Sequence, residues 1–414
     1  MLIGTNLTYT KAYNYRIVFE TIRLHGSISR ADIARKSNLT AQTVSNIVTR
    51  LLDKQIIQEG RKRQKDRGAP SVALEINPEG AYSIGLDLNR DHLTGILVDL
   101  NGEVKTKMFY EIDSPTPEQA IELMVYTIHQ LLESHEIDDS KFCGVGIGLP
   151  GPIEINGDDI INGSVHPKAF PNWSHVPIVK LLAKHINTPI YLENNASAAT
   201  IGERWYGAGK NISNFLYTFF GVGLGGGLVL NGNLFEGFNH NAGELGYFPF
   251  FSDLSPLTNS PKPHIGEHFN LSRLYEWLKE YDVFVSRPED LNDLFFSGQP
   301  QFKEWLALGK RLLLPVFIAV EYVFDPEVII LGGRLPQPII KDMCDDLPRL
   351  LAEIRIPEKS YAPKFKCATA GIDAAALGAA TLPMFNLFAA QPGVLIKNSQ
   401  QLSSFEDMAP LFSG

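Results

Sequence analysis

Residues 215–232 read FLYTFFGVGLGGGLVLNG, an apolar run, a glycine-rich turn and a second apolar run. We interpret this pattern as two strands joined by a turn, because strands are short apolar segments bounded by glycines. The same pattern of apolar segments and glycines recurs from residue 81 onward, for example in FCGVGIGLPGPIE at 142–154. Residues 117–134 (PEQAIELMVYTIHQLLES) have a helical pattern instead. Strands that alternate with helices predict an α/β body of two lobes.

The first 77 residues have a different pattern, which predicts three short helices. Apolar spacing over 14–26 indicates a helix that ends at Gly26, and Ser29 can cap a second one. A third helix begins after Thr40, with one apolar stripe made of Val44, Ile47, Val48, Leu51 and Leu52. Its other face is polar and nearly uncharged, and consists of Gln42, Thr43, Ser45, Asn46, Thr49 and Arg50. Such a face suits a helix that reads base edges in the major groove of DNA.

A basic hairpin follows these helices. The segment EGRKRQKDRGAPS at 59–71 precedes VALEI at 72–76, which we interpret as strand, basic loop and strand, the wing of a winged helix-turn-helix. The cations of this wing are Arg61, Lys62, Arg63, Lys65 and Arg67. They could contact phosphates or enter the minor groove. The alternative is a flexible basic linker.

Charge divides the chain at the same place. Residues 1–77 hold 13 Lys and Arg against 6 Asp and Glu, whereas 78–414 hold 24 against 40, within a total of −9. A basic head on an acidic body predicts that only the head meets a polyanion, because Lys and Arg neutralise phosphates. A merely solvated basic surface is the alternative.

Composition bounds the class of protein. A chain of 414 residues that is 44% hydrophobic and 20% charged is globular, with two or three domains. No apolar run approaches the roughly 20 residues of a membrane span, and the start lacks the apolar stretch of a secretory signal, so we expect a cytoplasmic protein with no membrane partner. Cys143, Cys344 and Cys367 lie far apart, which suggests no disulfide framework and favours buried thiols.

Several motifs of the body occur in one order. They are Asp87, Gly148-Leu149-Pro150-Gly151-Pro152, Glu193-Asn194-Asn195, Gly221 to Gly227, Ala242-Gly243-Glu244-Leu245-Gly246 and Leu331-Gly332-Gly333. With the winged helix before them, these motifs resemble the ROK family (repressors, open reading frames and kinases of sugar metabolism) in its transcription-regulator branch. The resemblance covers roughly residues 10–384. It implies a two-lobed actin-like (ASKHA, ribonuclease H-like) sugar kinase fold, with a cleft in which the family's kinases transfer a phosphoryl group from ATP to a sugar.

Three departures from the kinase pattern concern that reaction. Family kinases have an Asp at the position of Asn195, and an amide cannot accept the proton of the sugar hydroxyl. The loop after Asp87 reads Leu88-Asn89-Arg90-Asp91-His92 where the family has Gly and Thr, which crowds a triphosphate. Val222 replaces a Thr in the second phosphate loop. We therefore expect no catalytic residue, no enzyme activity and no cofactor.

The family's zinc pattern is incomplete. It consists of a His after Gly-Glu-x-Gly and three Cys soon afterwards. Here Tyr247 stands at the position of that His, and no cysteine occurs between Cys143 and Cys344. His264 and His268 are four apart, but we expect them to be ordinary histidines and expect no metal.

The resemblance also places a sugar site by motif position. The expected contacts to sugar hydroxyls are Asn194, Asn195, Glu244, Tyr247 and Glu267. Tyr247 replaces the family's sugar-contacting His and offers a hydroxyl and a ring face. Lys168 lies near a sugar-contacting Asn of the family and could meet an anionic ligand; a surface lysine is the alternative.

We divide the chain into a winged helix (1–77), a first lobe (78–198, with about 372–384 returning to it), a second lobe (199–371) and a tail (385–414) with no assigned role. The leading hypothesis is a repressor that binds a palindromic double-stranded DNA operator as a homodimer or homotetramer. A sugar or sugar phosphate in the cleft would alter lobe closure and operator binding. The alternatives are a sugar kinase that also binds DNA, and a regulator controlled by a protein that docks near Tyr247–Phe251.

Overall fold

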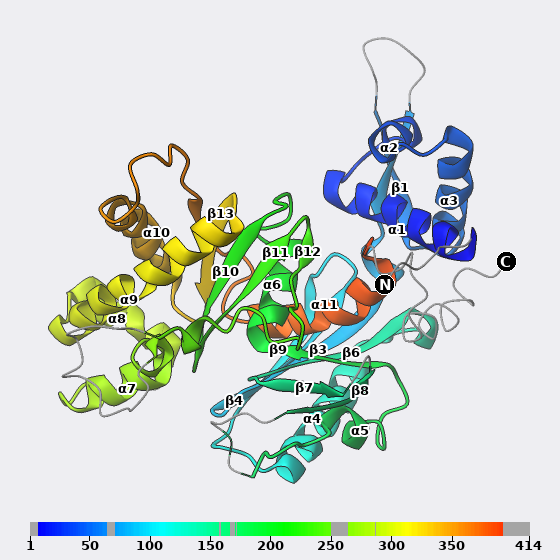
Figure 1. Cartoon of the computed structure of the whole chain (residues 1–414). Helices are drawn as coiled ribbons and strands as arrows, with labels where there is room; N and C mark the ends of the chain where they lie inside the picture. Colours follow the sequence, from blue (N-terminus) through cyan, green and yellow to red (C-terminus); the bar gives the residue numbers. More distant parts are fainter. Residues whose placement is uncertain are drawn as a thin grey trace.

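The computed structural model describes residues 7–63, 71–156, 159–165, 170, 172–249, 264–285 and 287–391. Figure 1 shows a small N-terminal head beside a body of two lobes. Each lobe is built on one five-stranded sheet, and two separate two-stranded hairpins complete the strands of these ranges. None of the helices found in the described ranges has the length and apolar character that crossing a membrane requires.

The head has the predicted order of three helices and a hairpin. It contains α1 (Leu7–His25), α2 (Arg30–Ser37), α3 (Ala41–Asp53), β1 (Ile57–Arg63) and β2 (Ser71–Ile76), the strands being antiparallel. The side chain of Ser29 accepts a hydrogen bond from the backbone N–H of Asp32, and Thr40 does the same for Thr43, so both predicted N-caps form. The apolar stripe of α3 is buried, except for Leu52, which is half-buried.

The first lobe has the strand order β5-β4-β3-β6-β9. Its strands are β3 (Tyr82–Leu88), β4 (His92–Asp99), β5 (Val104–Glu111), β6 (Phe142–Leu149) and β9 (Ile190–Asn194), and its helices are α4 (Pro117–Glu133) and α5 (Ile178–Leu182). A hairpin of β7 (Ile153–Asn156) and β8 (Asp159–Val165) is attached. Strands β3 and β4 are buried along their whole length, so the centre of this sheet forms the core of the lobe.

The second lobe has the strand order β12-β11-β10-β13-β14. Its strands are β10 (Phe215–Phe220), β11 (Leu224–Leu230), β12 (Asn233–Leu234), β13 (Val328–Gly333) and β14 (Lys364–Cys367), and its helices are α7 (Leu271–Lys279), α8 (Leu291–Ser297), α9 (Pro300–Phe324) and α10 (Gln337–Ala352). The predicted strand, turn and strand of 215–232 are the antiparallel pair β10 and β11. The four helices share one apolar core with this sheet.

Two further helices, α6 (Asn195–Trp205) and α11 (Ala374–Phe388), lie between the sheets (Figure 1). Helix α11 comes last in the sequence but packs on β3 and β6 of the first lobe. A Cβ atom added to Gly227 of β11 would lie 2.2 Å from the Thr200 hydroxyl, so this glycine permits the close approach of α6 to the second sheet. Residues 385–388, which we assigned to the tail, form the last turn of α11, and 392–414 lie outside the described residues.

Candidate functional site

The polar face of α3 is accessible in the head. Gln42, Asn46, Thr49 and Arg50 are exposed, and Thr43 and Ser45 are half-buried. Gln42 Nε2 donates to Asn46 Oδ1 at 3.0 Å, so the two amides lie side by side on this face. Amide groups in such a position can donate to and accept from base edges. The structure thus brings the predicted base-reading residues together on one helix.

The wing is described only at its base. Arg61 is exposed on β1, and the register pairs Lys62 with Val72 and Arg63 with Ser71. The predicted loop residues Lys65 and Arg67 lie outside the described residues. The pairing of β1 with β2 shows that the predicted hairpin forms. The phosphate contacts of its cations stay a prediction.

A cavity of about 210 Å³ lies between the two lobes. One side comes from the turn after β6, at Pro150 and Gly151, and from the start of α6. The other side comes from the β10–β11 turn and from the segment 240–247. The N-terminal end of α6 therefore opens into this cavity, where its backbone N–H groups and dipole favour electron-rich oxygen atoms.

Four of the predicted sugar-binding residues line the cavity: Asn194, Asn195, Glu244 and Tyr247. Asn194 caps α6, since its Oδ1 accepts from the backbone N–H of Ala196 at 2.9 Å. Burial raises the pKa of Glu244, and the pKa of Tyr247 is raised by burial and by the charge of Glu244. A Cβ atom on Gly151 would lie 2.8 Å from both Asn194 Nδ2 and Glu244 Oε1, so a glycine is needed for this turn to approach them.

The other two predicted residues are placed differently. Glu267 is absent from the lining; its Oε1 lies 3.1 Å from Nε2 of His264, which does line the cavity. His264 Nδ1 lies 2.8 Å from the carbonyl of Gly246, and its ring centroid lies 5.2 Å from that of Tyr247. Glu267 is thus in position to orient His264. Lys168 lies outside the described residues.

Sequence reasoning missed several lining residues, among them Arg90, His240 and Asn241. Arg90 belongs to the loop after Asp87, which we considered only as an obstacle to phosphate. Asn241 fixes the turn after β6, because its amide exchanges two hydrogen bonds with the backbone of Ile153, at 3.1 and 2.9 Å. Its position one residue before the Ala242–Gly246 motif is the signal that could have identified it.

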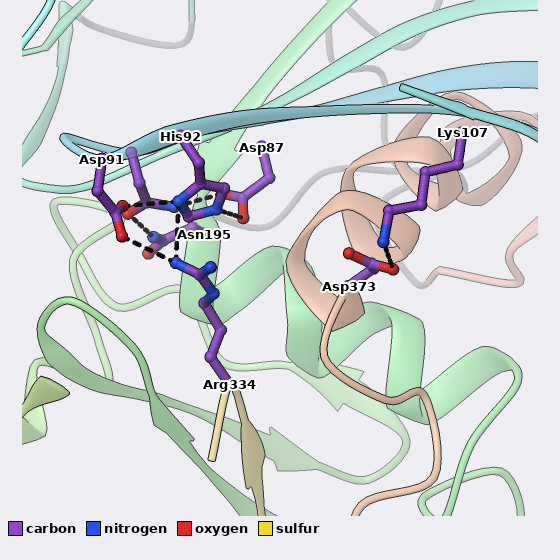
Figure 2. Close-up of polar contacts among 8 residues, drawn as sticks. Asp87, Asp91, His92, Lys107, Asn195, Arg334 and Asp373 are labelled. Atoms are coloured by element: carbon purple, nitrogen blue, oxygen red, sulfur yellow. Dashed lines mark hydrogen bonds and ion pairs between the residues drawn. The ribbon is translucent and has the colours of Figure 1, made fainter. Parts of the chain in front are cut away.

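A polar network lies beside the cavity (Figure 2). His92, which is 2% exposed, has Nδ1 at 2.6 Å from Asp91 Oδ1 and Nε2 at 3.4 Å from Asp87 Oδ2. Arg334, which follows β13 of the second lobe, has Nη1 at 3.1 Å from Asp91 Oδ2 and 2.9 Å from His92 Nδ1. Asn195 Nδ2 donates to Asn89 Oδ1 at 3.2 Å. The network therefore joins the two lobes and reaches the cavity through Asn195.

The pKa values within this network favour the charged forms. Burial alone would raise the pKa of Asp91, but its hydrogen bond with His92 and the charges of His92 and Arg334 lower it to about 2. Burial alone would lower the pKa of His92, but its hydrogen bonds to Asp87 and Asp91 raise it. Arg334 thus pairs with Asp91, and the hydrogen bonds of His92 with Asp87 and Asp91 shift its pKa toward the protonated form.

The described part of this region offers no set of metal ligands. Across the described ranges, His, Cys, Asp and Glu side chains nowhere gather into a group of three that could hold a metal ion. Asp87, Asp91 and His92 are engaged with one another and with Arg334. What the arrangement offers chemically is a cavity with amide, carboxylate and phenol groups, suited to binding hydroxyl groups.

Comparison with known proteins agrees with this architecture. The profile of the ROK family matches residues 83–264, and that of the MarR family matches residues 17–67. A xylose repressor of Bacillus spizizenii is 29% identical over 58% of this chain and 61% of its own length. A glucokinase of Thermotoga maritima is 30% identical over 50% of this chain and 67% of its own length.

The chain spans about three fifths of the length of the xylose repressors that it matches. A solved ROK family transcriptional regulator, described as a homolog of the E. coli MLC protein, superposes with a TM-score of 0.73 at 20% identity, over 96% of this chain and all of that one. This likeness confirms the predicted fold, a winged helix-turn-helix followed by a two-lobed actin-like body.

Proposed function

The chain belongs to the ROK family, and from that premise we propose that it is a DNA-binding transcriptional repressor whose body senses a sugar. The observation that carries the proposal is the joining, in one chain, of two parts. One is a winged helix with an exposed polar recognition face on α3. The other is a body with a hydroxyl-binding cavity between its lobes. Each part alone is compatible with several functions, but together they favour a ligand-responsive regulator.

In this proposal the head binds duplex DNA. Gln42, Thr43, Ser45, Asn46 and Arg50 read bases from the major groove, and the cations of the wing contact phosphate or the minor groove. The regulator acts in the cytoplasm as a homodimer or homotetramer on a palindromic operator, because a two-fold protein matches a two-fold site. In this proposal the head (1–77) binds DNA, the two lobes bind the sugar, and the tail has no assigned role.

The effector in this proposal is a neutral sugar or a sugar phosphate. Asn194, Asn195, Glu244 and Tyr247 contact its hydroxyls, and Glu267 acts through His264. The names of the xylose repressor and the glucokinase supply D-xylose and D-glucose as probes. A third relative, an N-acetyl-D-glucosamine kinase of Yersinia pseudotuberculosis that is 26% identical over 59% of this chain, supplies N-acetyl-D-glucosamine. A phosphorylated sugar would use Arg90 or Lys168 as its cation.

We also propose that the body is not a kinase. Asn195 cannot act as a base, and its amide is engaged with Asn89. In the family's kinases the loop after this Asp leaves room for phosphate. Here the same loop carries Asp91 and His92, which form the network with Arg334. A triphosphate would have to break this network and face the carboxylate of Asp91.

A selection experiment tests the proposal. The full chain is incubated with a random-sequence DNA library, bound fragments are enriched, and the selected site is mapped by footprinting. We expect a palindromic site whose binding is lost in a Gln42→Ala, Asn46→Ala double variant and retained in a Lys341→Gln variant, because the side chain of Lys341 is 68% exposed on α10 of the body. Enrichment of no sequence, or equal binding by the double variant, would contradict the recognition role of α3.

A further inference from the structure

Two arginines of α1 cap helices of the body. Arg16 Nε and Nη2 donate to the carbonyls of Leu387 and Asn386, each at 2.9 Å, in the last turn of α11. Arg23 Nη1 donates to the carbonyl of Trp205, the last residue of α6, at 2.6 Å. Carbonyls in the last turn of a helix lack partners within the helix and carry the negative end of its dipole, so a cation there is stabilising.

Both caps are buried and geometrically fixed. Arg16 is 5% exposed and Arg23 is 6% exposed. Glu20 accepts two hydrogen bonds from Arg23, at 2.8 and 2.6 Å, and the guanidinium lies 4.7 Å from the centroid of the Trp205 ring. Burial lowers the pKa of Arg16 to about 10, so its charge still persists at neutral pH. Moving α1 away would take the Arg16 guanidinium from its acceptors in α11, and would take Arg23 from its acceptor in α6 while leaving it paired with Glu20 of α1. Both hydrogen-bonded contacts therefore tie α1 to the body.

Helix α6 connects the cavity to the head. Its N-cap Asn194 and first residue Asn195 line the cavity, and its last residue Trp205 accepts the hydrogen bond from Arg23. Eleven residues span about 16 Å at 1.5 Å per residue. A single helix therefore has one end at the candidate ligand site and the other at the head.

The two capped helices are packed too closely to move without affecting each other. A Cβ atom on Gly378 of α11 would lie 1.8 Å from the carbonyl oxygen of Ala198 in α6, and one on Gly202 would lie 3.1 Å from the Cα of Gly378. Glu203 of α6 also accepts hydrogen bonds from the backbone N–H groups of Thr369 and Ala370, at 2.9 and 2.7 Å. A ligand that shifts the cavity end of α6 must therefore displace the whole helix relative to α11.

We propose that Arg16 and Arg23 are positioning residues that couple the cavity to the DNA-binding head. A ligand at the start of α6 displaces that helix relative to α11, and the two caps, each holding one helix, convert the displacement into a changed orientation of α1 and hence of α3. The coupling rests on the proposed function, since it requires a ligand and DNA that favour different states. It goes further by naming the contacts through which the two sites communicate.

The test compares coupling ratios in four proteins: the full-length wild type, Arg23→Gln, Arg23→Lys and Lys11→Gln. Lys11 is an exposed residue of the same helix and serves as the charge-matched control. For each protein, the Kd for the selected DNA site is measured without sugar and with saturating D-xylose, D-glucose or N-acetyl-D-glucosamine. The reverse ratio, the sugar Kd with and without DNA, must agree by linkage.

We expect wild type and Lys11→Gln to show the same sugar-induced change in the DNA Kd, in the range of about 5- to 150-fold that is usual for allosteric coupling. Arg23→Gln should bind both DNA and sugar but show a change of less than about 2-fold. Arg23→Lys, which keeps the charge and loses the fork to Glu20, should be intermediate. A lower overall stability alone would not change a ratio measured within one protein.

The results distinguish a failure of the proposed coupling from a failure of the proposed function. If the wild type responds to a sugar and Arg23→Gln responds equally, the coupling role is refuted and the proposed function stands. If the wild type binds its site equally with every sugar, the sensing part of the proposed function fails and the coupling fails with it. If Arg23→Gln does not fold, Arg23→Lys decides, and an undiminished ratio in that variant overturns the inference.

Discussion

Replacing Arg334 with glutamine should weaken the contact between the lobes at neutral pH, by an amount that becomes smaller in acid. Arg334 Nη1 lies 3.1 Å from Asp91 Oδ2, a distance at which two unit charges attract by about 5 kcal/mol at an effective dielectric constant of 20 and by about 1 kcal/mol in water. The Asp91 side chain is 45% exposed, so screening brings the value toward the lower limit. We expect Arg334→Gln to lower the free energy of unfolding by about 1–2 kcal/mol at pH 6.

The pH dependence has a defined sign. Because the pKa of Asp91 is lowered to about 2, its ionised form stabilises the fold above the usual carboxyl pKa, and this stabilisation is lost as the pH falls toward 2. Without Arg334 the pKa of Asp91 rises toward its ordinary value of 3.8, so the variant has less of this stabilisation to lose, and the difference in unfolding free energy between the two proteins should narrow as the pH falls below about 4. Arg334 also lowers the pKa of His92, and its removal should favour the imidazolium, which offsets part of the cost.

Urea unfolding followed by tryptophan fluorescence, at pH values from about 2.5 to 7, measures both effects. Arg349→Gln is the matched control, because its side chain is 65% exposed and lies 3.5 Å from Asp346 and from Glu353, whose side chains are 41% and 63% exposed. That control should change stability by less than about 0.5 kcal/mol. If the two variants lower the unfolding free energy equally and show the same pH dependence, Arg334 does not stabilise the contact between the lobes.

Three further predictions concern catalysis, proton linkage and DNA contacts. Asn195→Asp should not produce ATP turnover with D-glucose or D-xylose in a coupled assay, because the Asp91–His92–Arg334 network persists; turnover above the wild-type background would show that one amide alone blocks catalysis. Burial raises the pKa of Glu193 to about 8, so the unfolding free energy of the wild type should fall by a few kcal/mol as the pH rises from about 4.5 to 8. Glu193→Gln should remove this pH dependence in urea titrations. An unchanged pH dependence in the variant would show that another group binds the proton. Arg61→Gln should reduce the salt dependence of DNA binding by about one phosphate contact in anisotropy titrations, whereas an identical slope would remove Arg61 from the interface.

The features that sequence predicts well are local. The caps Ser29 and Thr40 and the apolar stripe of α3 are signals within one or two turns of a helix, so they require no knowledge of distant contacts. The glycine-rich turn at 221–223 between β10 and β11 is equally local. These positions form the structures that their side chains favour, because local preference and tertiary packing agree there.

The features that sequence could not predict join distant segments. Arg16 and Leu387 are 371 positions apart, and a local pattern identifies an arginine on a helix as a solvated residue. His92 and Arg334 meet across 242 positions, so a loop that we considered an obstacle to phosphate proves to be a contact between lobes. Glu267 carries the right chemistry for a sugar, but its carboxylate lies against His264, an orientation that no motif specifies.

The central claim is that a sugar in the cavity changes the affinity of the head for DNA. The most direct test is an anisotropy titration of the selected DNA site with the full chain, at two salt concentrations, with and without D-xylose, D-glucose and N-acetyl-D-glucosamine. The account predicts that one sugar weakens binding at least about 5-fold at both salt concentrations, and that Glu244→Ala abolishes this response while DNA binding remains. Sequence-specific binding whose affinity is the same without ligand and with each of the three sugars would contradict it.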